Sequence, residues 1–294
     1  MPPVAAFGTH ARQLGIIGNP VAHSLSPIMH NEAFRHQRMN CVYSAFPVAP
    51  EDLRAAIEGV RALGFLGVNV TIPHKEAVLE YLDEVAPTAR QVGAVNTIVN
   101  RSGRLIGYNT DGWGFISSLE EAGVKPAGRP AVVLGAGGAA RAVAVHLALA
   151  GVRSLTITNR TLSRAEALAE AVRKVAPELP IRAVQAQSQA ERQALTEDGL
   201  VVNCTSLGMH PETGGTPVAE INLLPQNAVV YDTVYVPEET RLLKEARMRG
   251  LTAIGGLGML VHQGACAWEY WFGRRGPVKV MLDAAKSALE GRSA

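Results

Sequence analysis

Apolar positions recur along the chain in two alternating patterns: short apolar runs typical of buried strands, and longer stretches with one apolar face typical of helices. Ser26 stands directly before Pro27, which predicts an N-cap followed by proline at the first position of a helix. In the first part of the chain the patterns predict strands at 14–17, 41–46, 67–72, 94–99 and 105–108, and helices at 26–36, 53–63 and from 76 to about 80.

The same alternation starts again after Asp111-Gly112. Before that point, Asn100-Arg101-Ser102-Gly103 has the composition of a β-hairpin turn between two strands. Residues 185–199 are polar and fit either a helix or a loop. In the second part the patterns predict strands at 131–134, 154–158, 200–203 and 229–232, a helix up to Ala150, and a helical tail from Leu257 onward. Two α/β domains follow from this alternation.

Lys75 stands at a strand-to-helix junction. Pro73 ends the predicted strand, so Lys75 falls in the first turn of the next helix, where the positive end of the helix dipole disfavours a cation. Ligands of α/β sheets collect beyond the carboxyl ends of strands. We therefore expect Lys75 to have a function, against the alternative of a solvated lysine, which suits most of the 28 Lys and Arg residues.

Composition narrows the class of protein. The 294 residues are 47% hydrophobic and 18% charged with a net charge of +2, which is typical of a globular protein of about two domains. No basic run suggests nucleic-acid binding, and no apolar run approaches the roughly 20 residues that span a membrane. The N-terminus lacks the pattern of a secretory signal. The 3 cysteines are widely spaced, which predicts buried thiols in a reducing cytoplasm.

A glycine-rich turn follows the predicted strand at 131–134. Gly135-Ala136-Gly137-Gly138-Ala139-Ala140 fits the dinucleotide-binding pattern between a strand and a helix. The first glycine allows the tight turn, the second admits a pyrophosphate against backbone N–H groups, and Ala140 permits close packing of helix on strand. The alternative is a glycine turn with a structural role only.

The following strand indicates which dinucleotide binds. A carboxylate at its end would hold the ribose 2′-hydroxyl of NAD and would repel the 2′-phosphate of NADP. Here the strand ends in Asn159-Arg160-Thr161, and Arg164 follows one turn later. A guanidinium binds a phosphate through two hydrogen bonds, so NADP is favoured over NAD. The alternative is that both arginines are ordinary surface charges.

Nine short motifs occur in order, four in the first part of the chain and five in the second. They are residues 19–27, 69–75, 93–97, 107–112, 135–140, 159–161, 203–206, 231–235 and 256–264. Together they resemble the motifs of the shikimate dehydrogenase family, and the resemblance extends from about Ile16 to Phe272, nearly the whole chain.

This resemblance implies the reversible, NADPH-dependent reduction of 3-dehydroshikimate to shikimate in aromatic amino-acid biosynthesis. It also implies a discontinuous substrate-binding α/β domain, residues 1–112 plus 259–294, which the C-terminal helices complete. A Rossmann-type NADP-binding domain would occupy residues 113–258. The partner is then a small molecule, neither nucleic acid nor membrane; monomer and homodimer both stay open.

The motifs also assign residues to the two ligands. By resemblance, the Ser24 and Ser26 hydroxyls hold the substrate carboxylate, with Tyr235 adding a contact near that end. The residues around the ring hydroxyls and the reacting carbon are Thr71, Lys75, Asn96, Asp111 and Gln263. The cofactor residues are Gly135, Ala136, Gly137, Gly138, Ala139, Asn159, Arg160, Thr161, Arg164, Thr205 and Gly256.

The residue types fit this chemistry independently of the resemblance. When hydride reaches a carbonyl carbon, the oxygen gains negative charge and needs a proton, which a lysine ammonium can supply. Asp111 would favour the charged lysine, whereas desolvation and a helix N-terminus would favour the neutral amine. Taken alone, Asp111-Gly112 is equally typical of a simple turn, and the two serines are equally typical of helix capping. The spacing of His23, His30 and His74 supports no standard metal site.

Two other functions stay open on the sequence. A quinate/shikimate dehydrogenase of the same family often accepts NAD, which Asn159-Arg160-Thr161 argues against. A catalytically silent NADP-binding regulator would not need the pair Lys75 and Asp111.

Overall fold

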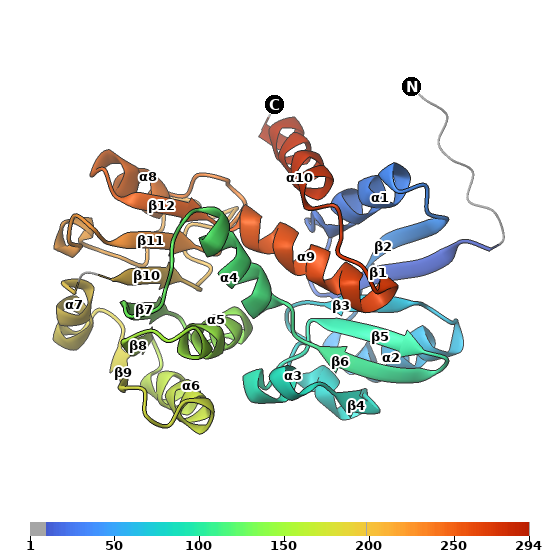
Figure 1. Cartoon of the computed structure of the whole chain (residues 1–294), viewed down its shortest axis with the longest axis horizontal. Helices are drawn as coiled ribbons and strands as arrows, with labels where there is room; N and C mark the ends of the chain where they lie inside the picture. The colour runs from blue at the N-terminus through green and yellow to red at the C-terminus, as the bar shows by residue number, and fades with distance from the viewer. Residues whose placement is uncertain (1–9, 198, 294) are drawn as a thin grey trace. The chain divides into compact units, whose positions relative to one another are not determined.

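The computed structural model describes residues 10–197 and 199–293 and divides into two compact units. One unit is Met1–Thr110 with Gln263–Ala294, and the other is Asp111–His262. The boundaries expected from the motifs were 112 and 258. Each unit is built around its own six-stranded sheet (Figure 1). The predicted fold class, two α/β domains of which one is Rossmann-type, is confirmed.

The sheet of the first unit is mixed. Its strand order is β2-β1-β3-β5-β6-β4, in which β1, β2 and β3 run parallel and β5 pairs antiparallel with both β3 and β6. The hairpin predicted at Ser102-Gly103 joins β5 to β6, and both turn residues have positive φ. The strands are β1 (Arg12–Gly18), β2 (Cys41–Pro47), β3 (Gly67–Val70), β4 (Glu84–Val85), β5 (Thr97–Arg101) and β6 (Arg104–Tyr108).

Helices cover both faces of this sheet. The apolar face of α2, predicted from its periodicity, buries Ile57 and Val60 against Val68 and Val70 of β3. On the opposite face Trp271 lies against Gly67, where any side chain would clash, and α10 packs along α1. The helical elements are α1 (Ser26–His36), η1 (Pro50–Asp52), α2 (Leu53–Ala62), η2 (Ala77–Tyr81), α3 (Pro87–Val92), α9 (Leu257–Phe272), which belongs to this unit from Gln263 onward, and α10 (Val278–Ser293).

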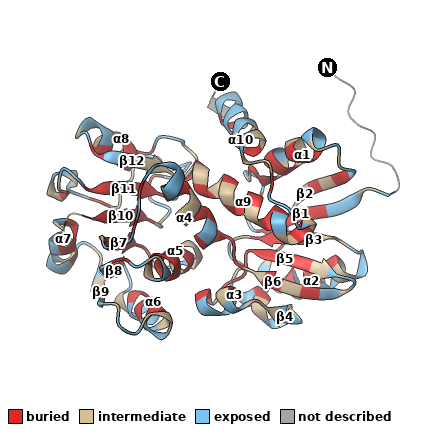
Figure 2. Cartoon of the chain, viewed as in Figure 1, coloured by how far each residue is buried: buried red, intermediate tan, exposed pale blue. Residues whose placement is uncertain are grey.

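The sheet of the second unit is entirely parallel, in the order β12-β11-β10-β7-β8-β9. Counted from β7, this is the Rossmann order, and the chain changes direction between β7 and β10. The central strands are buried throughout (Figure 2), which explains their continuous apolar runs. The strands are β7 (Pro130–Leu134), β8 (Ser154–Asn159), β9 (Ile181–Gln185), β10 (Leu200–Asn203), β11 (Val229–Asp232) and β12 (Thr252–Gly255).

Apart from α4, which precedes β7, the helices of this unit connect successive strands. Ala194, Leu195, Leu242 and Ala246 fill the core beside β7, β10 and β11. The segment 185–199, undecided from sequence, holds the end of β9 and then α7, which Ser188 caps by accepting from the Glu191 N–H. The helical elements are α4 (Asp111–Glu121), α5 (Gly138–Leu149), α6 (Leu162–Val175), α7 (Gln189–Leu195), η3 (Ile221–Leu223) and α8 (Arg241–Met248).

Two local expectations near the N-terminal motifs are wrong. Ser26 is the first residue of α1 and not its N-cap; Leu25 holds that position, without a side-chain cap. Lys75 does not open an α-helix, because only the short 3₁₀ helix η2 forms, two residues later. An isolated turn of this kind has little dipole, so the dipole argument for Lys75 fails.

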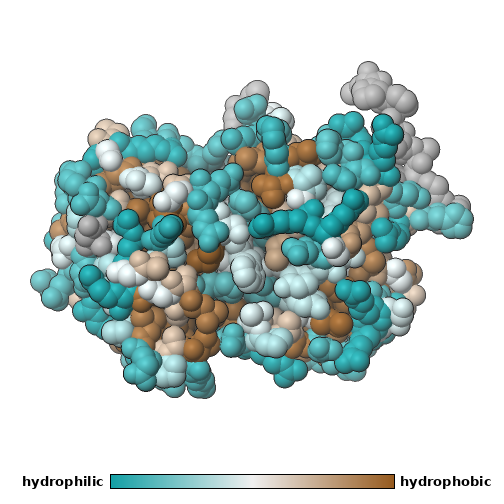
Figure 3. All heavy atoms as spheres, viewed as in Figure 1, coloured by the Kyte–Doolittle hydropathy of each residue, from teal (hydrophilic) through white to brown (hydrophobic). Residues whose placement is uncertain are grey.

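The surface gives one further fact. Within residues 10–197 and 199–293, no helix is long and apolar enough to span a membrane. On the face shown in Figure 3, hydrophobic side chains occur in separate groups among hydrophilic ones.

Candidate active site

The glycine-rich turn follows β7 in the geometry that a dinucleotide requires. Gly135 has φ +108°, and a Cβ there would lie 3.1 Å from the Cys204 carbonyl oxygen. Gly137 is the N-cap of α5, and a Cβ there would meet open space. Ala140, in the first turn of α5, is fully buried. The turn therefore leaves room for a pyrophosphate beside the free N–H groups at the N-terminus of α5.

The loop after β10 faces this turn across the switch point of the sheet. Asn203 at the end of β10 accepts hydrogen bonds from the Thr205 N–H at 2.9 Å and from the Thr205 hydroxyl at 2.7 Å. The Thr205 Cγ2 also lies against Gly135, at 3.1 Å from a Cβ built there. The structure thus brings together the two loops that sequence motifs assigned to the cofactor, where ligands of this fold bind.

The end of β8 carries the predicted phosphate-binding arginines. The Asn159 amide donates to the Thr161 carbonyl at 2.9 Å, and the Gln185 amide donates to the Arg160 carbonyl. These bonds fix the backbone of the loop, whereas the Arg160 and Arg164 side chains are exposed. A fixed backbone with two exposed guanidinium groups presents positive charge for an anion.

The first unit contains a buried group of amides and hydroxyls around Asn96. Asn96 Oδ1 accepts from the Thr110 N–H at 2.8 Å, and its Nδ2 donates to the Thr110 hydroxyl at 2.9 Å and lies 3.4 Å from Gln263 Oε1. Asn96 is 3% exposed and Gln263 is 8% exposed. Asn96 and Gln263, predicted from separate motifs, are therefore brought together. Asp111 follows Thr110 directly.

Lys75 lies in the turn between β3 and η2 and is half-buried. Its carbonyl accepts from the Val95 N–H at 2.8 Å, which ties the turn to the residue before Asn96. In the same turn the Thr71 carbonyl accepts from the His74 N–H at 2.9 Å. The His74 ring is buried and bonds the Val48 carbonyl at 2.7 Å, a packing role.

The serine turn between β1 and α1 holds its two hydroxyls differently. Ser24 Oγ accepts from the Ser26 N–H at 3.2 Å, so its own proton is left for another acceptor. Ser26 is buried at the first position of α1. Both serines lie in the first unit with Thr71, Lys75, Asn96 and Gln263.

The remaining substrate residues belong to the second unit. Asp111 is the first residue of α4, where a carboxylate is favourable, and is 6% exposed. Gly112 lies directly under the His146 ring: a Cβ on Gly112 would be 1.9 Å from Nδ1. Burial lowers the pKa of His146, and the Ala142 carbonyl and the Asp111 charge oppose this effect. His146 therefore packs as a neutral ring beside the start of α4.

The loop after β11, which carries Tyr235, is organised by Asp232. This fully buried carboxylate accepts from Asn203 at 2.9 Å, from the Val234 N–H at 3.0 Å and from the Thr240 hydroxyl at 2.7 Å. Burial raises the pKa of Asp232, and these hydrogen bonds work in the opposite direction. Gly256 lies against the same loop, since a Cβ there would be 2.2 Å from the Thr233 carbonyl oxygen.

Several residues of these sites were not singled out from the sequence. Asn69, Thr110 and Asp232 lie within the family motifs, so their position in those motifs could have marked them as site residues. His146 stands in an alanine-rich helix and gave none.

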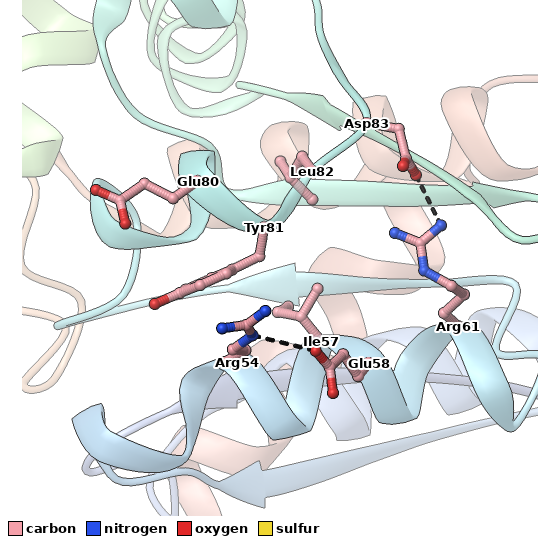
Figure 4. A pocket seen from close by; sticks show the side chains of 8 residues that line it. All are labelled: Arg54, Ile57, Glu58, Arg61, Glu80, Tyr81, Leu82 and Asp83. Carbon is pink, nitrogen blue, oxygen red and sulfur yellow. Dashed lines mark hydrogen bonds and ion pairs between the residues drawn. The ribbon is translucent and has the colours of Figure 1, made fainter.

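Other features of the described surface do not join the site. A hollow of about 310 Å³ lies between α2 and η2 (Figure 4). Four of its charged residues form ion pairs, Arg54 with Glu58 and Arg61 with Asp83, and no predicted site residue lines it. Within residues 10–197 and 199–293, no group of three or more His, Cys, Asp and Glu is placed to hold a metal ion.

Sequence comparisons identify relatives along the chain. Residues 16–98 match the family described as shikimate dehydrogenase substrate binding domain, residues 120–205 match shikimate / quinate 5-dehydrogenase, and residues 256–286 match the shikimate 5′-dehydrogenase C-terminal domain. Shikimate dehydrogenase (NADP(+)) of Symbiobacterium thermophilum is 67% identical over 283 residues, which cover 96% of each chain.

Solved structures are similar over the same length. Shikimate 5-dehydrogenase from Thermus thermophilus, in complex with NADP(H) and shikimate, is 40% identical with a TM-score of 0.85, covering 95% of this chain and 100% of that one. Quinate dehydrogenase from Corynebacterium glutamicum, in complex with NAD, is 35% identical with a TM-score of 0.88, covering 94% and 99%.

Proposed function

The chain belongs to the shikimate dehydrogenase family, and on this premise we propose which of its residues carry out the reaction. It is an NADP-dependent oxidoreductase that interconverts 3-dehydroshikimate and shikimate in aromatic amino-acid biosynthesis. The individual roles below are our proposal, since they rest on motif, local geometry and chemistry.

Substrate is held mainly by the first unit. The Ser24 and Ser26 hydroxyls bind the carboxylate, and Tyr235 adds a contact at that end. Thr71, Asn96 and Gln263 surround the ring hydroxyls. The supporting observation is the buried bond network of Asn96 with Thr110 and Gln263, which holds amide groups in fixed orientations.

Lys75 is the proton donor. Reduction of the carbonyl puts negative charge on the oxygen, which the Lys75 ammonium stabilises and then protonates; in the oxidation direction the neutral amine takes the proton back. Asp111 acts with Lys75 at the reacting carbon, as the family motifs imply. One observation supports this assignment. The Lys75 carbonyl accepts a hydrogen bond from the Val95 N–H, and Val95 directly precedes Asn96. The Asn96 side chain in turn accepts from the Thr110 N–H, and Thr110 directly precedes Asp111.

The cofactor residues fit NADP. The open space at Gly137 and the N-terminus of α5 suit a pyrophosphate, and Arg160 with Arg164 suits a 2′-phosphate because β8 ends without a carboxylate. Gly135, Ala136, Gly138, Ala139, Asn159, Thr161, Thr205 and Gly256 complete the predicted set. When bound, NADPH supplies the hydride.

Exchange of Lys75 for alanine tests the proton donor. Turnover of shikimate should fall on the order of 10²–10⁴-fold, because a positioned acid is removed, and shikimate affinity should change far less. Lys125→Ala removes an exposed lysine from the second unit and should leave turnover unchanged. Turnover of Lys75→Ala within a few-fold of the wild type would exclude Lys75 as the donor.

Side-by-side assays of shikimate and quinate with NADP and NAD test substrate and cofactor choice. Preferred oxidation of shikimate with NADP is expected. Faster NAD-linked oxidation of quinate would favour the quinate-type function. If the protein binds NADP but oxidises neither compound, it would be a catalytically silent binding protein. A cytoplasmic location, which the widely spaced free cysteines support, belongs to this proposal, as does a monomeric or homodimeric state.

A further inference from the structure

Tyr43 of β2 is a fully buried tyrosine, 1% exposed, whose position is fixed at several points. The Asn31 side chain of α1 holds its backbone, donating to the Tyr43 carbonyl at 2.8 Å and accepting from the Tyr43 N–H at 2.9 Å. The Tyr43 ring stacks on His30 with centroids 4.5 Å apart and planes 14° apart. The phenol hydroxyl therefore has a defined place in the first unit.

That hydroxyl reaches across one strand of the sheet. Tyr43 stands opposite Leu14 of β1, and Asn69 of β3 stands opposite Ile16. Positions two residues apart along a strand share a face, so both side chains are on the same side of the sheet. The Tyr43 hydroxyl spans β1 and lies 2.6 Å from Asn69 Oδ1.

The direction of this hydrogen bond is determined by the other end of the Asn69 amide. Asn69 Nδ2 lies 3.1 Å from the Asn96 carbonyl oxygen and 3.0 Å from the Thr97 hydroxyl. A backbone carbonyl can only accept, so the amino end of Asn69 must face Asn96 and the oxygen end must face Tyr43. Tyr43 is therefore the donor of this hydrogen bond.

Burial supports a neutral phenol that stays protonated. It raises the pKa of Tyr43 well above the ordinary value, although the polar Ser26 side chain acts in the opposite direction. Without the phenol proton, Asn69 Oδ1 would be a buried acceptor lacking this donor, and an amide held at one end only can rotate.

Resting on the proposed function, we propose that Tyr43 is a positioning residue of the substrate site. Its hydroxyl fixes the Asn69 amide, whose amino end in turn bonds the Asn96 carbonyl and the Thr97 hydroxyl. Tyr43 thus acts, through Asn69, on the Asn96 backbone from a strand that is far away in the sequence.

The test is the exchange Tyr43→Phe, which keeps the ring and removes only the hydroxyl. The kcat/KM for shikimate should fall about tenfold, the factor that corresponds to a loss of about 1.4 kcal/mol, while the KM for NADP stays within about twofold. Asn69→Ala should give a similar selective loss. The double variant should be no worse than Asn69→Ala alone, because both exchanges remove the same bond.

Tyr81→Phe is the matched control, since Tyr81 lines the surface hollow between α2 and η2 and should keep wild-type kinetics. Independent, multiplying losses in the double variant, an unchanged kcat/KM in Tyr43→Phe, or equal losses for shikimate and NADP would each overturn the proposal. If Tyr43→Phe does not fold, the selectivity of the Asn69→Ala loss decides. Shikimate oxidation by the wild type tests the proposed function separately.

Discussion

His30 should make the stability of this protein depend on acidity. The ring is completely buried in α1 among Tyr43, Phe34, Trp268 and Trp271, and within the described residues neither ring nitrogen has a hydrogen-bond partner. Burial lowers the pKa of His30 from 6.5 to about 3. Protonation of the folded state would leave a buried, unpaired charge.

The sign and size of the effect follow from proton linkage. Between the folded pKa of about 3 and the unfolded value of 6.5, only the unfolded chain binds this proton, so stability falls as pH is lowered through that window. From pH 7 to pH 5, His30 alone should lower the free energy of unfolding by about 2 kcal/mol. The group is fully buried, so solvent screening does not reduce this figure.

The variant His30→Phe should remove this dependence. Phenylalanine fills the aromatic site without a titratable group, and any overpacking of about 1–3 kcal/mol shifts stability equally at both pH values. Urea unfolding at pH 7 and pH 5 measures the difference: the wild type should lose about 2 kcal/mol more than the variant. His36→Phe, an exposed position on the same helix, is the control and should keep the wild-type dependence. Equal losses in the wild type and His30→Phe would refute the assignment.

Three further exchanges test separate parts of the structure. Arg160→Ala should weaken NADP binding by about 1.5–3 kcal/mol with little effect on NAD binding. Equal changes in the Michaelis constants for NADP and NAD would contradict a phosphate-binding role. Ser24→Ala should weaken shikimate binding by about 1.5–3 kcal/mol, since Ser24 has a proton to donate, and should lower the melting temperature slightly because the Ser26 N–H loses its acceptor. Unchanged affinity in a binding titration would count against this role. Gly112→Ala should destabilise the protein by about 1–3 kcal/mol because its Cβ would lie 1.9 Å from His146 Nδ1, whereas Gly59→Ala in open space should not; calorimetric melting of both separates the cases.

The sequence alone determined those features whose physical cause is local. The strand, glycine turn and helix at 130–149 depend on short-range geometry, and the positive φ of Gly135 requires the residue that stands there. The hairpin at Ser102-Gly103 likewise follows from turn chemistry. The family resemblance added the substrate motifs, and the comparisons confirm the family.

Tertiary structure decided what depends on distant partners. Whether Ser26 caps α1 or is buried as its first residue depends on what packs around it, and whether Lys75 opens a helix depends on how the chain after Pro73 is tied to Val95. Local propensity favoured the wrong answer in both cases. Asn96 contacts Gln263, which is 167 positions away in the sequence. His30 is shielded from water only when α1 packs against the aromatic side chains of α9. Burial and hydrogen-bond direction exist only after such segments meet, because both are properties of the surroundings of a side chain and not of its neighbours along the chain.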